Sequence, residues 1–259
     1  MWNTVKMELY RMLHMKCFYG LLAMMMALTG LYAGVVFWDT SDMVLSTLQS
    51  ILDCSVEGIM HKIYGGGAMA LLFLVIFVIL YVRQDISSGY IKNIGGQFAH
   101  PMKLVGVKTI VVALYLAVVF IIGFVEICVF DLLLTGKIFI HDTSYLGRVV
   151  LVDYIMSLAF LSFCFFLCTL LRNTTAVMSI GILLVMGIMD IVYVAIDFAL
   201  GKIGIENAHI EDISLLSTFS GLSDELLWSE VSHGIVMAAI YFFGSLILNC
   251  LLFEKRDIV

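Results

Sequence analysis

The sequence predicts an all-α membrane protein with six transmembrane helices, and three observations lead to this prediction. Apolar residues make up 62% of the 259 positions and charged residues 13%, whereas soluble domains average about 45–50% apolar and about 25% charged residues. A single proline argues against a loop-rich or disordered chain. The apolar residues gather in six segments, each close to the ~20 residues that cross a bilayer core. We expect residues 1–259 to form a single transmembrane domain.

The predicted spans are separated by polar segments and cover roughly residues 17–37, 64–82, 104–130, 149–171, 176–200 and 233–253. The first is too long for the apolar region of a cleaved signal peptide and is followed by further spans, so it is expected to remain in the protein. The third is long enough to tilt, or to begin among the lipid headgroups.

Two segments outside the spans are expected to lie at the membrane surface. In residues 1–16, apolar side chains recur at helical spacing between cations, namely Trp2, Val5, Leu9, Met12 and Leu13. This pattern predicts an amphipathic helix in the interface, with its cations toward anionic lipid. The segment 201–232 is too apolar for a solvated linker. It is expected to fold back against the outer membrane surface as short re-entrant helices.

The distribution of Lys and Arg predicts the topology, because cytoplasmic loops carry an excess of both. One side holds ten of them: Lys6, Arg11, Lys16, Arg83, Lys92, Lys103, Lys108, Arg172, Lys255 and Arg256. The other side holds four: Lys62, Lys137, Arg148 and Lys202. A multi-pass protein with both termini in the cytoplasm is therefore expected.

Several kinds of chemistry are not expected on this chain. Gly136-Lys137 and Gly201-Lys202 lack the flanking residues of a phosphate-binding loop. The sequence has no metalloprotease or esterase motif, so it predicts no catalytic residue and no metal ligand. His61, His209 and His233 are interpreted as solvated residues of outer loops. The net charge of −6 makes a nucleic-acid partner improbable.

The connection between the second and third spans, residues 83–100, predicts a short amphipathic helix. Its apolar residues recur at helical spacing: Ile86, Tyr90, Ile91, Ile94 and Phe98. Asp85 or Ser87 could cap its start, and Gly95-Gly96 marks its end. The apolar face must be buried against either lipid or another protein.

Two groups of residues resemble a known family. Asp85, Gly89 and Lys92, followed by Pro101, Lys103 and Lys108, look like the corresponding region in permeases of the ABC-2 class of ATP-binding-cassette exporters. The six-span layout and the terminal Phe253–Ile258 segment are similar to small permeases for bacteriocin immunity and for antimicrobial or cytolytic peptide export. The family more often has Glu at the position of Asp85.

This resemblance implies a bacterial plasma-membrane permease that exports a hydrophobic or amphipathic substrate, most plausibly a peptide. It implies a second permease subunit, the same or different, and two cytoplasmic ATPase subunits that bind ATP and Mg, with no cofactor on this chain. Residues 83–100 would then be the coupling helix. The candidate contacts with the ATPase are Asp85, Gly89, Tyr90, Ile91, Lys92 and Ile94.

Four carboxylates lie within the predicted spans, namely Glu126, Asp153, Asp190 and Asp197. An ionised carboxylate at mid-bilayer costs roughly 2.5–3.5 kcal/mol on insertion scales, so such groups face protein or water. One interpretation is an acidic outer chamber on the substrate pathway. The other is that these acids cap outer-loop amides or pair with Arg148 and Lys202.

A close helix contact is predicted at Gly30 and Gly34, which fit the small-xxx-small pattern. The resemblance implies that this part of the first span belongs to the seam between two permeases. Two other functions remain open at this point. An ion-coupled secondary transporter would use Glu126 and Asp190 as proton carriers, and an immunity or sensor protein would bind a toxin without moving it.

Overall fold

The chain is all-helical in the part that its computed structural model describes, which comprises residues 2–37, 56–65, 69–87, 101–135, 138, 140, 143–171, 173–202, 214–220 and 228–255. No strand occurs in these residues. The helices are α1 (Trp2–His14), α2 (Lys16–Phe37), α4 (Val56–Tyr64), α5 (Met69–Ser87), α7 (Pro101–Thr135), α8 (Thr143–Leu170), α9 (Thr174–Val185), α10 (Ile188–Lys202), α11 (Leu215–Ser220) and α12 (Trp228–Lys255).

Within the described residues, four helices are long and apolar enough to cross a membrane, which marks the chain as membrane-embedded. The apolar stretches run over Lys16–Val35, Lys103–Leu133, Thr143–Leu170 and Val231–Phe253. They correspond to the first, third, fourth and sixth predicted spans. The apolar stretches of α5 and α9, Ala70–Gln84 and Thr174–Val185, are shorter than a full span.

The second predicted span, 64–82, differs from the structure at its start. Tyr64 is the last residue of α4, and α5 begins at Met69. Three consecutive glycines, Gly65 to Gly67, separate the two helices in the sequence, and glycine is unfavourable within a helix. Our prediction continued the apolar segment through these glycines and therefore missed α4 as a separate helix.

The fifth predicted span, 176–200, is not one continuous helix. Helix α9 ends at Val185 and α10 starts at Ile188, with Gly187 between them at φ 69°. The N–H groups of Met186 and Gly187 donate to the carbonyls of Ile182 and Leu184, as they do at a helix end closed by a left-handed glycine. Periodicity alone did not reveal this break, because apolar residues continue through it.

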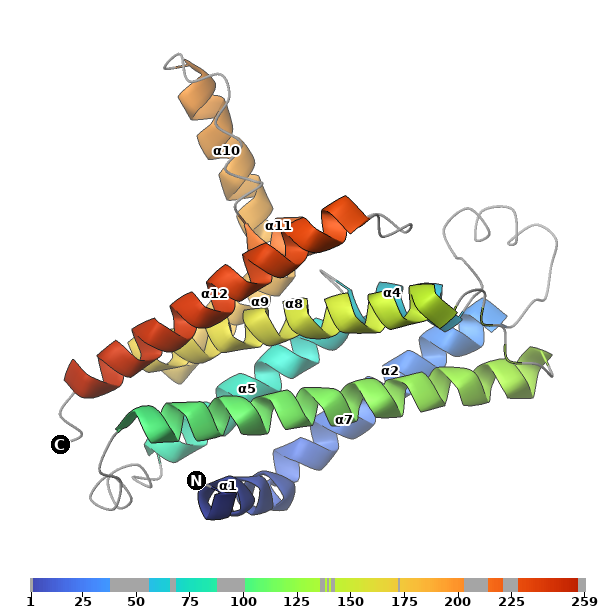
Figure 1. Ribbon diagram of the computed structural model, residues 1–259, viewed down its shortest axis with the longest axis horizontal. Coiled ribbons are helices and arrows are strands. Elements are labelled where there is room, and N and C mark those ends of the chain that lie inside the picture. The colour runs from blue at the N-terminus through green and yellow to red at the C-terminus, as the bar shows by residue number, and fades with distance from the viewer. Residues whose placement is uncertain are drawn as a thin grey trace.

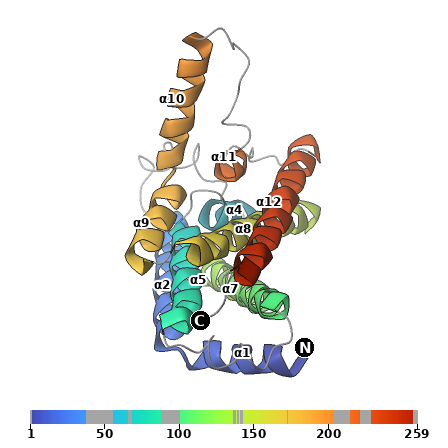
Figure 2. The ribbon, with the colours of Figure 1, turned by 90° about the vertical axis from the view of Figure 1, so that its left-hand side faces the viewer.

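The long helices α2, α5, α7, α8 and α12 run side by side and form the bundle (Figure 1). Helix α1 lies across one end of this bundle, and Figure 2 views the molecule from that side. The C-terminal end of α12 lies at the same end, which we call the α1 end. The opposite end, where α4 lies, is the α4 end. Helix α10 extends away from the bundle in both views.

Helix α8 is the centre of the packing, since it contacts α12, α5, α4 and α7. Small polar side chains join α8 to α12: the hydroxyls of Ser162 and Ser245 are 2.7 Å apart, and Thr169 donates to the side-chain oxygen of Asn249 at 2.6 Å. Hydrogen bonds between small side chains are typical of helix contacts in membranes. They hold the fourth and sixth predicted spans together.

Helix α4 is buried along most of its length and packs against α7 and α8. Its last residue, Tyr64, is 1% exposed, and its ring lies 4.8 Å from that of Phe120. The hydroxyl of Tyr64 lies directly over Gly123 of α7, where an added Cβ would overlap it. Gly123 thus provides the space in which α4 packs against the bundle.

We predict that Gly123→Ala destabilises the protein, because the Tyr64 ring is packed and cannot move aside. Overpacking of this kind costs about 1–3 kcal/mol. Gly106→Ala on the same helix is the matched control, since an added Cβ there meets no atom within 4 Å. Thermal unfolding in detergent should show a lower midpoint for Gly123→Ala only. In a Tyr64→Leu background, which lacks the hydroxyl, Cζ and Cε2 atoms that the new methyl group would meet, Gly123→Ala should cost much less, and an unchanged cost would contradict the proposed contact.

Candidate functional site

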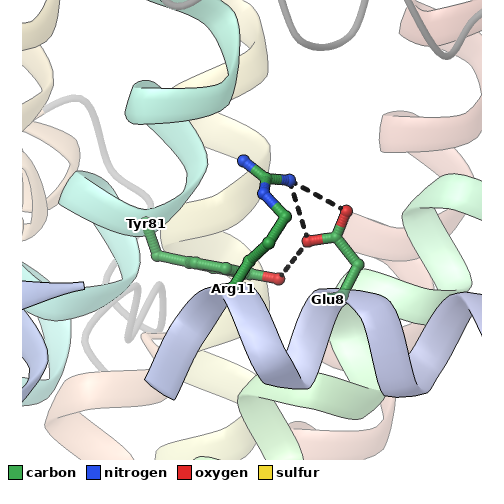
Figure 3. Close-up of polar contacts among 3 residues, drawn as sticks. All are labelled: Glu8, Arg11 and Tyr81. Carbon is green, nitrogen blue, oxygen red and sulfur yellow. Dashed lines mark hydrogen bonds and ion pairs between the residues drawn. The ribbon is translucent and has the colours of Figure 1, made fainter. Parts of the chain in front are cut away.

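A buried carboxylate anchors α1 to the bundle. Glu8 is fully buried, although it lies on a helix whose sequence suggests a surface position. The hydroxyl of Tyr81, near the end of α5, donates to Oε2 of Glu8 at 2.8 Å. Nη1 of Arg11 donates to both oxygens of the same carboxylate, at 3.2 and 3.4 Å. Figure 3 shows the Tyr81 hydroxyl and the Arg11 guanidinium converging on Glu8 from two elements.

Tyr81 extends this contact into the bundle. Nζ of Lys108 on α7 lies 4.9 Å from the centre of the Tyr81 ring, and Lys108 is 1% exposed. A cation in this position is attracted by the ring face. Phe77 stacks on Tyr81 and lies 3.9 Å from the ring of Tyr115. The α1 end is thus a continuous network that links α1, α5 and α7.

A second buried polar contact lies at the α4 end. Nδ1 of His61 on α4 is 3.0 and 3.1 Å from the two carboxylate oxygens of Asp153 on α8, so the ring N–H donates to the carboxylate. His61 is 9% and Asp153 1% exposed. Glu57, one turn before His61 on α4, is also buried. Our interpretation of His61 as a solvated loop residue is therefore wrong, because α4 is inside the bundle rather than in a loop.

Glu126 on α7 lies beside α2. A Cβ added at Gly30 would be 2.9 Å from Oε1 of Glu126 and 3.0 Å from the ring of Phe130. The space above Gly30 is therefore filled by α7 of the same chain. An added Cβ at Gly34 meets no atom within 4 Å. Of the two glycines predicted at a permease seam, Gly34 faces open space, and a contact there with a second subunit stays a prediction.

The four predicted pathway acids do not form one cluster in the structure. Glu126 and Asp153 lie in the bundle, and both helices that carry them contact α4. Asp190 and Asp197 lie on α10, which extends away from the bundle (Figure 1). The side chain of Asp197 is half-buried, whereas that of Asp190 is outside the described residues. Of the four acids, Asp153 is thus buried in the bundle, and Glu126 is half-buried there.

Of the predicted coupling residues, the structure describes only the first, Asp85, and of that residue only the backbone. Helix α5 continues to Ser87 and so includes the backbone of Asp85. The side chain of Asp85, together with Gly89, Tyr90, Ile91, Lys92 and Ile94, lies outside the described residues. The segment 201–232 contains α11 (Leu215–Ser220), which agrees with a short helix before the last span.

The amino-acid sequence did not point to four of the site residues, namely Glu8, Tyr81, His61 and Tyr64. A carboxylate among apolar residues on one face of the predicted amphipathic helix was the one available signal for Glu8. The partners of His61 and Glu8 are 92 and 73 positions away in the sequence. No pattern within a single segment could reveal these contacts.

The two buried contacts join helices that are distant in the sequence: Glu8 connects α1 to α5, and His61 connects α4 to α8. Ionisable groups inside a membrane protein are costly unless they are paired. Within the residues that the structure describes, no three His, Cys, Asp or Glu side chains are grouped so as to hold a metal ion.

We predict that Asp153→Ala strongly destabilises the protein, because removing one partner of a buried pair costs about 3–5 kcal/mol. Leu151→Ala, at an exposed position of the same helix, is the control and should change the unfolding midpoint little. Replacing both partners, His61→Leu with Asp153→Leu, should be less harmful than Asp153→Ala, since no buried charge is then left alone. Thermal unfolding in detergent measures all three, and equal effects of Asp153→Ala and Leu151→Ala would contradict the assignment.

Comparison with known proteins does not assign a family to the chain. No protein-family model matches it, and a search of curated proteins finds no match. What the chain does must therefore be inferred from the geometry described above and from the motifs in its sequence.

Proposed function

We propose that this chain is the membrane-embedded permease subunit of an ATP-binding-cassette exporter, which moves a hydrophobic or amphipathic substrate, most plausibly a peptide, out of the cell. ATP and Mg bind to a separate ATPase in the cytoplasm. The observation that carries the proposal is the contact between Glu8 and Tyr81, at 2.8 Å. It joins the amphipathic N-terminal helix to the end of α5, four positions before Asp85.

This position matters because the coupling segment of the proposal, residues 83–100, begins at the end of α5. A push on this segment would act first on Arg83, which is 5% exposed, and then on Tyr81. Tyr81 is bonded to α1 and lies against Lys108 of α7. A displacement of the segment would thus move three helices together, as a subunit driven from the cytoplasm requires.

The substrate path in this proposal passes the α4 end, where Glu126 and Asp153 lie in the bundle. Charged groups inside a membrane protein are expensive and usually mark a pathway for a polar or charged ligand. A second permease subunit would complete the pathway, with Gly34 of α2 as the place on this chain for a close contact.

The His61–Asp153 pair favours a second candidate function. A buried His paired with a carboxylate is a group that carries protons in transporters. An ion-coupled secondary transporter would use this pair together with Glu126 and would need no ATPase.

We expect a soluble protein with a phosphate-binding loop to co-purify with the tagged chain from its native membrane in mild detergent. Tyr90→Asp with Ile94→Asp should abolish this recovery while leaving membrane insertion intact, because the apolar face of the coupling helix would be lost. Mass spectrometry identifies the partner and any second permease. Recovery of the chain alone, with proton uptake into vesicles that depends on Asp153, would establish the ion-coupled alternative instead.

We also predict that Tyr81→Phe weakens coupling without preventing assembly. The variant removes the hydroxyl that donates to Glu8 and leaves the ring that packs against Phe77 and Lys108. Tyr19→Phe, at an exposed position of α2, is the control. In the purified complex, stimulation of ATPase activity by the permease should fall about tenfold for Tyr81→Phe, the effect of losing one hydrogen bond to a charged group. Unchanged stimulation in both variants would contradict the role of this contact.

A further inference from the structure

A cavity of about 510 Å³ lies at the α1 end, between α1, the start of α2 and the end of α5. Cationic and hydrogen-bonding side chains from the three helices line it, among them Tyr10, Arg11, His14, Lys16 and Gln84. This cavity is separate from the α4 end, and Tyr81, whose hydroxyl donates to Glu8, is among the residues that line it.

The lining of the cavity suits an anion. Arg11 and Lys16 carry positive charge, and His14 adds a third basic group beside them. Of the described residues that line the cavity, none is Asp or Glu. The carboxylate on the same helix, Glu8, is buried and accepts hydrogen bonds from Tyr81 and Arg11. A phosphate group matches these donors, because guanidinium and ammonium groups bind phosphate oxygens through charge-assisted hydrogen bonds.

The surroundings of the cavity favour a lipid as the source of such a phosphate group. Trp2 and Tyr10 are exposed on α1, as aromatic residues are at the membrane interface. Lys16 begins α2, and the exposed side chains that follow on this helix are apolar, namely Tyr19, Met24, Leu31 and Val35. A headgroup in the cavity would therefore place its acyl chains along an apolar helix surface. A free phosphate ion has no apolar part that could contact that surface.

We propose that this cavity binds the phosphodiester headgroup of an anionic phospholipid from the leaflet at the α1 end. Lys16 and His14 contact the phosphate, and Arg11 lies between it and Glu8. The lipid then closes the junction between α1 and α2 and holds α1 against α5. This inference does not rest on ATP-driven transport, since an ion-coupled transporter would use the same site.

The test is a titration of the purified full chain in detergent with dioleoyl phosphatidylglycerol, followed by native mass spectrometry of the bound lipid. Lys16→Gln should weaken binding about fivefold, the effect of one basic residue on an anionic lipid. Lys6→Gln removes the same charge from an exposed position of α1 that does not line the cavity, and it should change binding less than twofold. Lys16→Arg should bind as the natural chain does, which separates loss of charge from loss of folding.

Three results would overturn the proposal. Equal weakening by Lys6→Gln and Lys16→Gln would mean that general attraction, not the cavity, holds the lipid. Equal retention of phosphatidylcholine and phosphatidylglycerol would show that the net charge of the lipid is not recognised. Displacement of phosphatidylglycerol by millimolar inorganic phosphate would identify a site for free phosphate. None of these results depends on an ATPase partner.

Discussion

The hydrogen bonds between His61 and Asp153 are the interaction on which the α4 end depends. An apolar interior accepts a carboxylate only when a donor meets it, since an unpaired charge there costs several kcal/mol. Asp153 is on α8, the helix at the centre of the packing, so its partner must come from a neighbouring element. Helix α4 supplies that partner and is held inside the bundle by it. The same helix supplies Tyr64, which packs over Gly123.

At the α1 end, too, a buried carboxylate depends on hydrogen-bond donors, but these are a hydroxyl and a guanidinium rather than an imidazole. Glu8 would be too costly to bury without the hydroxyl of Tyr81 and the guanidinium of Arg11. Once it is paired, an amphipathic helix that could lie loosely on a membrane is fixed to α5. At each end of the bundle, a buried carboxylate thus accepts a hydrogen bond from a residue that is distant in the sequence.

Much of the fold could be predicted from the sequence, because a long apolar segment indicates a helix that crosses the membrane. The spans at 17–37, 104–130, 149–171 and 233–253 correspond to α2, α7, α8 and α12. The segments at 64–82 and 176–200 were harder, since their breaks depend on glycines rather than on polarity. Gly187 adopts φ 69°, which hydropathy does not register. Of the site, Glu126 and Asp153 could be singled out as acids within the bundle, but their surroundings could not be predicted, because contacts between distant helices leave no local pattern.

The packing at Gly30 has a consequence for how this protein can change over evolutionary time. The carboxylate of Glu126 and the ring of Phe130 occupy the space that a side chain at position 30 would need. A methyl group gained at this position would require the flexible end of Glu126 to shift and the Phe130 ring to move slightly, and a larger side chain would have to displace both residues. Positions 30 and 126 are therefore expected to covary among relatives of this chain, and position 34, with open space around it, is free to vary independently within a single subunit.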